Sequence, residues 1–128
     1  MDTTTNTYLA GNFAPVTEEV TAFDLEVTGT IPDGLDGRLL RNGPNPPLPV
    51  ERPESYHWFT GAGMVHGLRL RAGRAEWYRN RWVGAAEGFT PNTNVIGHAG
   101  RTWAIVESGP PPVEMTDELA SVGANGFY

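Results

Sequence analysis

The sequence predicts an all-β fold made of short antiparallel strands, and three observations support that prediction. Two segments, 63–83 and 92–109, each contain two strand-like stretches separated by a two-residue turn that includes glycine. Glycine (16) and proline (11) together make up about a fifth of the 128 residues, which suits many strands joined by tight turns. No convincing long helix is present in the pattern. A β-propeller, whose blades are small antiparallel sheets, is the leading architecture, and a β-sandwich is the alternative.

The sequence of the N-terminal part predicts a polar tail followed by one strand. Residues 1–7 are polar, and we expect them to be disordered. The segment 22–32 alternates Phe23, Leu25 and Val27 with polar residues, which predicts a half-buried strand.

A turn, a short strand and a loop are predicted next. The sequence DGLDG at 33–37 has the composition of a turn, and a strand is predicted at 38–42. Residues 43–53 contain five prolines. Because proline has no backbone donor for a strand ladder, we expect this stretch to be a loop.

Two hairpins follow, and they carry the clearest local signal. One face of the first strand in 63–83 would hold Met64, His66, Leu68 and Leu70. The dipeptide Ala-Gly, at 72–73 in the first segment and at 99–100 in the second, marks the tip of each hairpin. Such a repeat favours a series of small antiparallel sheets.

The C-terminal stretch leaves two interpretations open. Residues 115–122, sequence MTDELASV, are compatible with one helical turn capped by Thr116, or with a loop. The final GANGFY suggests no closing strand, so we expect the chain to be the front portion of a larger protein.

Composition excludes several classes of function. The net charge of −6 argues against a nucleic-acid surface. The lack of cysteine excludes disulfides, thiolate metal sites and a cysteine nucleophile. No signal peptide or apolar run long enough for a membrane span is evident, so we expect a cytoplasmic location.

The three histidines, His57, His66 and His98, are the first candidates for a metal centre. Imidazole ligands would have to converge on one point, and the spacing of these residues matches no short metal-binding motif. We therefore favour a structural interpretation, with His66 as a half-buried strand residue and His98 beside a turn.

Glu107 is the carboxylate most open to a functional interpretation. It directly follows the apolar stretch TWAIV, at the end of a predicted buried strand. A carboxylate in such a place needs hydrogen-bond donors or a cation. It either turns to solvent at the strand end or holds the N–H group of a metal-bound imidazole.

Four stretches in combination resemble the N-terminal part of the carotenoid cleavage oxygenases, over residues 8–128. They are GNFAPVTEE, LEVTGTIPDGLDGRLLRNGPNP, YHWFTGAGMVHGLRLRAGRAEWYRNRWV and NTNVIGHAGRTWAIVESG. Members of this family are non-haem iron dioxygenases that cut a C=C bond of carotenoids, apocarotenoids or stilbenes.

The resemblance implies a single domain, part of a seven-bladed β-propeller that this chain leaves incomplete. It also implies one Fe(2+) held by four histidines in the full-length protein, glutamates that orient three of those imidazoles, and O₂ and an apolar carotenoid or apocarotenoid as reactants. Peripheral membrane contact of the full-length protein is a further possibility.

Few of the family's functional positions fall within the chain. None of its histidines matches a ligand position, and the ligands are expected beyond Tyr128, so neither a catalytic residue nor a metal ligand is assigned. Glu107 alone matches, as an imidazole-orienting glutamate. We expect the chain by itself to be inactive.

Three departures from the family pattern bear on function. Ala62 stands where the family usually has an aspartate, and the segment 84–91 is shorter than the corresponding loop. Val106 stands where stilbene-cleaving members tend to have a lysine, which favours a carotenoid or apocarotenoid substrate over a stilbene. A stand-alone, non-catalytic β-domain or a pseudogene product is the alternative from a different class.

Overall fold

A computed structural model describes residues 6–50, 52–84 and 89–124, and within this part the chain forms eight strands and four short 3-10 helices. The strands are β1 (Thr21–Phe23), β2 (Gly37–Pro44), β3 (Gly63–Arg71), β4 (Arg74–Trp82), β5 (Asn94–His98), β6 (Arg101–Ile105), β7 (Val113–Met115) and β8 (Ser121–Ala124). The 3-10 helices are η1 (Thr7–Leu9), η2 (Gly11–Phe13), η3 (Pro53–Ser55) and η4 (Trp58–Thr60). No helix in these ranges has the length and apolar character to cross a bilayer.

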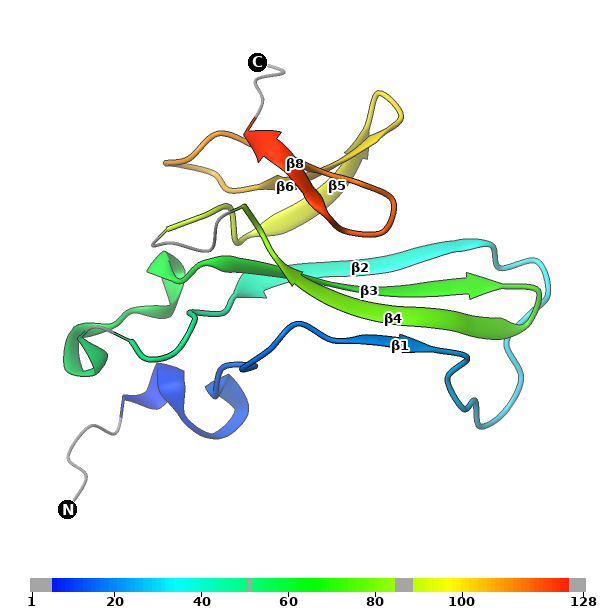
Figure 1. Cartoon of the computed structure of the whole chain (residues 1–128), viewed down its shortest axis with the longest axis horizontal. Helices are drawn as coiled ribbons and strands as arrows, with labels where there is room; N and C mark the ends of the chain where they lie inside the picture. The colour runs from blue at the N-terminus through cyan, green and yellow to red at the C-terminus, as the bar shows by residue number, and fades with distance from the viewer. Residues whose placement is uncertain (1–5, 51, 85–88, 125–128) are drawn as a thin grey trace.

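The strands form two four-stranded antiparallel sheets, which confirms the all-β prediction. The first sheet has the order β1-β4-β3-β2, and the second is a meander, β5-β6-β7-β8. Figure 1 shows the second sheet lying against one side of the first, with the 3-10 helices gathered at one end of the first sheet.

Both predicted hairpins are present, with the predicted two-residue turns. β3 and β4 are joined by Ala72-Gly73, with φ of 52° and 75°. β5 and β6 are joined by Ala99-Gly100, with φ of 54° and 75°. Positive φ at both central residues matches the right-handed twist of the flanking strands, and glycine at the second position makes it accessible.

The predicted strand at 22–32 is wrong over most of its length. Only β1, Thr21–Phe23, is a strand, and Phe23 is 65% exposed instead of buried. The reason is Asp24, whose φ of 48° lies in the left-handed region and turns the chain out of the extended conformation. The amide N–H groups of Asp24 and Leu25 still donate to β4, after which the chain leaves the sheet.

The strand predicted at 38–42 is confirmed and is longer than expected. It runs as β2 from Gly37 to Pro44 and pairs with β3 over its whole length. Pro44 is tolerated because it is the last residue of β2, which lies at an edge of its sheet. The proline-rich loop follows it.

At 115–122 the loop interpretation holds, and no helix forms. Thr116 accepts hydrogen bonds at Oγ1 from the N–H groups of Glu118 and Ala120, and thereby shapes a tight connection between β7 and β8. The last strand, β8, ends at Ala124, and the rest of the GANGFY stretch, for which no closing strand was expected, lies outside the described residues.

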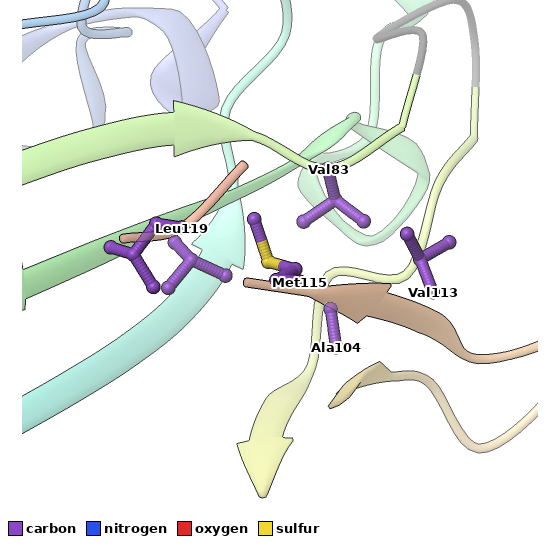
Figure 2. Packing of buried hydrophobic residues seen from close by; sticks show 6 residues of the cluster. Val83, Ala104, Val113, Met115 and Leu119 are labelled. Atoms are coloured by element: carbon purple, nitrogen blue, oxygen red, sulfur yellow. The ribbon is translucent and has the colours of Figure 1, made fainter. Parts of the chain in front are cut away.

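The core lies between the two sheets. Its buried members come from β3, the residue after β4, β6, β7 and the β7–β8 loop: Val65, Val83, Ala104, Val113, Met115 and Leu119. Figure 2 shows Val83, Ala104, Val113, Met115 and Leu119 converging between the strands. Burial of these apolar side chains joins the sheets face to face.

The predicted disordered stretch 1–7 lies mostly outside the described residues, in residues 1–5. Asn6 is described, and its side-chain amide donates to the carbonyl oxygens of Pro53 and Tyr56, each at 2.7 Å. Its Oδ1 accepts from the N–H of Tyr8 and caps η1. These bonds hold the start of the described chain against the loop that precedes η4.

Candidate functional site around Glu107

Glu107 lies just beyond β6, at the open end of the β5–β6 hairpin. The last residue pair of the hairpin is Asn94 opposite Ile105. The Glu107 side chain is exposed, and its Oε2 accepts a hydrogen bond from Thr93 Oγ1 at 3.0 Å. Glu107 therefore turns to solvent at the strand end and is held by a donor from the residue before β5, and its contact with a metal-bound imidazole stays a prediction.

Thr93 is itself held in place by the hairpin. Its backbone N–H donates to the carbonyl oxygen of Ile105 at 3.1 Å, which extends the ladder by one bond. Its hydroxyl also lies 3.2 Å from Oδ1 of Asn92. Backbone pairing therefore places Thr93, and the Thr93 hydroxyl in turn holds the carboxylate of Glu107.

Asn92 joins this site to the glycine-rich stretch before β3. Asn92 is buried, and its amide donates to the carbonyl oxygens of Phe59 at 2.9 Å and Gly61 at 2.8 Å. The two acceptors belong to η4 and the bend that follows it. Residues 57–61 are thus tied directly to the segment that carries Thr93.

Gly63 allows the glycine-rich stretch before β3 to contact the segment before β5. A β-carbon at Gly63 would lie 1.8 Å from the carbonyl oxygen of Pro91, so only glycine fits without moving backbone. Its N–H donates to Thr90 Oγ1 at 2.7 Å. The glycines of YHWFTGAGMVHG therefore serve a close approach between chain segments.

Asn42, at the end of β2, adds a link between the sheets. Its amide donates to the carbonyl oxygens of Pro91 at 3.2 Å and Asn94 at 3.0 Å. Its Oδ1 is buried and forms no hydrogen bond with the described residues. The polar contacts of Asn42 and Asn92 thus fix the start of β5 against the first sheet.

The structure does not bring the three histidines together. His57 caps η4, with Nδ1 accepting from the N–H of Phe59 at 3.1 Å. His66 lies on β3, and the carbonyl oxygen of His98, at the end of β5, accepts from Trp103 Nε1. No group of three or more His, Cys, Asp or Glu side chains in the described ranges could hold a metal ion.

His66 is a half-buried residue of the first sheet. Its Nδ1 lies 2.7 Å from the hydroxyl oxygen of Tyr78 on β4. Burial lowers the pKa of His66, and the positive charge of Arg41 lowers it further. The structural interpretation of His66 accounts for these contacts.

The sequence predicts a role for Glu107, which stays a prediction, and does not disclose the contacts of Thr93, Asn92 and Asn42 around it. The signal for Glu107 is a carboxylate placed directly after an apolar strand. Asparagine is also common in exposed turns, so its identity does not disclose that Asn92 is buried. The NTN sequence before β5 is the only sequence cue to this network of polar contacts.

The sequence of this chain matches one family model and is similar to known carotenoid-cleaving proteins. Residues 13–127 match the family model RPE65, retinal pigment epithelial membrane protein. The carotenoid cleavage oxygenase of Mycobacterium tuberculosis (strain H37Rv) is 54% identical over 143 residues, covering 95% of this chain and 28% of that protein. Carotenoid 9,10(9',10')-cleavage dioxygenase 1 of Phaseolus vulgaris is 52% identical over 77 residues, covering 59% of this chain and 13% of the relative.

The mycobacterial relative is longer than this chain, both within the aligned region and overall. The alignment extends over 143 residues, more than the 128 of this chain, so the relative has additional residues within the aligned region. The chain as a whole spans 28% of that relative's length.

Solved structures show the same fold. The lignostilbene dioxygenase of Pseudomonas brassicacearum superposes with a TM-score of 0.77 at 23% identity, over 94% of this chain and 31% of that one. Cobalt-substituted apocarotenoid oxygenase of Synechocystis superposes with a TM-score of 0.73 at 23% identity, over 87% of this chain and 30% of that one. The two sheets therefore correspond to part of a β-propeller. By themselves, the two described sheets do not close into a ring.

Proposed function

Because the chain belongs to the carotenoid cleavage oxygenase family, we propose that it is the N-terminal part of a non-haem Fe(II) dioxygenase. The reaction adds both atoms of O₂ across one C=C bond of a carotenoid or apocarotenoid and yields two carbonyl products. The observation that carries this proposal is the 54% identity to the mycobacterial oxygenase over 95% of the chain. A location in the cytoplasm is part of the proposal.

The described residues do not by themselves form an iron site. They contain no group of three or more potential ligands, so no reaction step is assigned to them. The contribution that we propose for this chain is Glu107, as an acceptor for the free N–H of an iron-bound imidazole. Its exposure and its anchoring by Thr93 support this role, because the carboxylate is held and still accessible.

We propose an apolar polyene substrate over a hydroxylated stilbene. Val106, directly before Glu107, offers no amine to a phenol hydroxyl group. The Pseudomonas lignostilbene dioxygenase shares the fold at 23% identity, a level that carries no argument about substrate.

Peripheral membrane contact belongs to the same proposal. Phe59 is 63% exposed, and its ring packs against Trp58, which in turn packs against the exposed Phe13. A cluster of exposed aromatic rings suits the interface between lipid headgroups and acyl chains, from which a polyene would be taken.

The test uses two proteins: the 128-residue chain, and an extended chain in which it is followed by the remainder of the mycobacterial relative. The extended chain is expected to bind one Fe(II) and to convert an apocarotenal and O₂ into two carbonyl products, identified by mass spectrometry. The 128-residue chain is expected to do neither. Stoichiometric iron binding and cleavage by the 128-residue chain alone would contradict the proposal.

Two further outcomes decide between the alternatives. Cleavage of a hydroxylated stilbene, but of no apocarotenal, would identify a stilbene-cleaving enzyme. A folded extended chain that binds iron yet cleaves neither class would favour a non-catalytic domain.

A further inference from the structure

Within the described part of the chain, the only hydrogen bond to the Glu107 side chain comes from Thr93. The Thr93 hydroxyl lies 3.0 Å from Glu107 Oε2, and Oε1 of the same carboxylate forms no hydrogen bond with the described residues. No arginine or histidine among those residues forms an ion pair with Glu107. An ionised carboxylate offers about four lone-pair sites, so one oxygen of Glu107 is held while the other stays open to a further donor.

Both side-chain neighbours of the Thr93 hydroxyl are acceptors, so the hydroxyl serves them as a donor. The second neighbour is Asn92, whose Oδ1 lies 3.2 Å from Thr93 Oγ1. The orientation of the Asn92 amide is fixed, because its nitrogen donates to the carbonyl oxygens of Phe59 and Gly61. The single hydroxyl proton of Thr93 therefore faces an amide oxygen and a carboxylate oxygen. The carboxylate oxygen is nearer and charged, so it receives the stronger hydrogen bond.

The place of Thr93 in the fold does not depend on its hydroxyl. Its backbone N–H donates to the carbonyl oxygen of Ile105, one step beyond the last residue pair of β5 and β6. The side chain itself is exposed. Replacing the hydroxyl by a methyl group therefore leaves the backbone pairing intact and removes only the donor to Glu107.

We propose that Thr93 is a positioning residue for the iron centre of the full-length protein, an inference that rests on the proposed function. The hydroxyl holds Oε2 and so restricts the rotation of the Glu107 side chain, which leaves Oε1 to accept the N–H of an iron-bound imidazole. A glutamate side chain without such a bond would lose its rotamer freedom only when it met the imidazole, at a cost to iron affinity. Thr93 thus acts through Glu107.

The Fe(II) affinity of the extended chain tests this role. Thr93→Val removes the hydroxyl and keeps the branched shape of the side chain. It is expected to weaken Fe(II) binding by about 3–10-fold in a titration against a competing chelator, which corresponds to the loss of one hydrogen bond. Thr93→Ser restores the hydroxyl and is expected to recover the affinity of the parent chain. No recovery in Thr93→Ser would contradict the proposal.

A double-mutant cycle shows whether Thr93 acts through Glu107. Glu107→Ala leaves the hydroxyl no carboxylate to hold, so adding Thr93→Val to it is expected to weaken Fe(II) binding no further. Losses that multiply in the double variant would overturn the proposal, because Thr93 would then act independently of Glu107. Parent-like affinity in Thr93→Val, together with weakened binding in Glu107→Ala, would overturn it as well.

A control variant separates positioning from general destabilisation. Thr102→Val removes a hydroxyl from β6 that is buried and accepts from Arg38 Nη2 at 2.6 Å. This variant is expected to lower the unfolding midpoint and to bind Fe(II) as the parent chain does. Equal losses of affinity in Thr102→Val and Thr93→Val would assign the effect to lost stability and would contradict the proposal.

Crystal structures of the iron-free extended chain separate this inference from the proposed function. If the parent chain binds no iron, the proposed function fails, and the conformation of Glu107 still tests the role of Thr93. The carboxylate is expected to keep one ordered conformation in the parent chain and to lose it in Thr93→Val. The same ordered conformation in both crystal structures would show that Thr93 does not position Glu107.

Discussion

Gly67 of β3 lies directly against Leu119 of the β7–β8 loop. A β-carbon at position 67 would come within 2.7 Å of Leu119 Cδ1 and 2.9 Å of Leu40 Cδ2. Both distances are shorter than real β-carbon contacts, so a methyl group at position 67 would displace the ends of both leucine side chains. Leu119 is fully buried at this point.

Replacing Gly67 with alanine is expected to destabilise the protein by about 1–3 kcal/mol, because the added methyl group overpacks the core between the sheets. Urea denaturation followed by tryptophan fluorescence measures the change. Gly97→Ala is the matched control on β5, where the nearest atom to a new β-carbon is 4.0 Å away. Equal free energies of unfolding for the two variants would show that the core between the sheets accommodates the added methyl group, and would contradict this prediction.

Removing the side chain of Asn92 is expected to lower the free energy of unfolding by about 1–3 kcal/mol, because the carbonyl oxygens of Phe59 and Gly61 lose their donor. Asn92→Asp tests the same point with little change in shape. Asn12→Ala, at an exposed position, is the control. Limited proteolysis is expected to become faster at 57–61 in both Asn92 variants, and resistance equal to that of the parent chain would contradict the anchoring role.

The stability of the protein is expected to fall as the pH is lowered from about 7.5 to about 5.5, with a contribution from His66. In the folded state burial and Arg41 lower the pKa of His66 below its usual 6.5, so the unfolded chain binds the proton more readily. The contribution of His66 is therefore fully present above the unfolded value and is lost as the pH falls toward the folded value.

Thermal unfolding at a series of pH values measures this effect. His66→Gln removes the titrating group and is expected to flatten the profile. An unaltered slope in His66→Gln would exclude His66 as the source.

Glu107→Gln in the extended chain is expected to weaken Fe(II) affinity by about 10–100-fold, because the amide is a weaker acceptor for an imidazole N–H than a carboxylate. Iron titration against a competing chelator measures the affinity independently of turnover. Glu107→Asp is expected to recover part of the loss. Glu114→Gln, on β7, is the control carboxylate, and equal losses in both variants would assign the effect to general destabilisation.

The hairpins were open to prediction from sequence because their determinants are local. Alternation with a period of two and an Ala-Gly turn specify the β3–β4 and β5–β6 pairs without reference to the rest of the chain. The predicted strand at 22–32 is wrong beyond Phe23 because Asp24 adopts a left-handed conformation, which the identity of the residue does not require. The strands β7 and β8 were not predicted. Leu119, at φ 70°, closes the turn between them, and the sequence of that turn equally suits the start of a helix.

The candidate site shows the same division. Glu107 is detectable because a carboxylate after an apolar strand conflicts with burial unless it has a partner. Its actual partner, Thr93, follows from the pairing of β5 with β6. The anchoring by Asn92 depends on where η4 lies in space, which no local pattern discloses.

The register of β1 has a consequence for the order of events during protein synthesis. Thr21 pairs with Arg79, so β1 has no partner strand until β4 has left the ribosome. The second sheet pairs only strands that are consecutive along the chain, and each can join as it emerges. Among the strands that the structure describes, β1 is made first and waits longest for its partner, and Phe23 stays without its Arg79 contact throughout that interval.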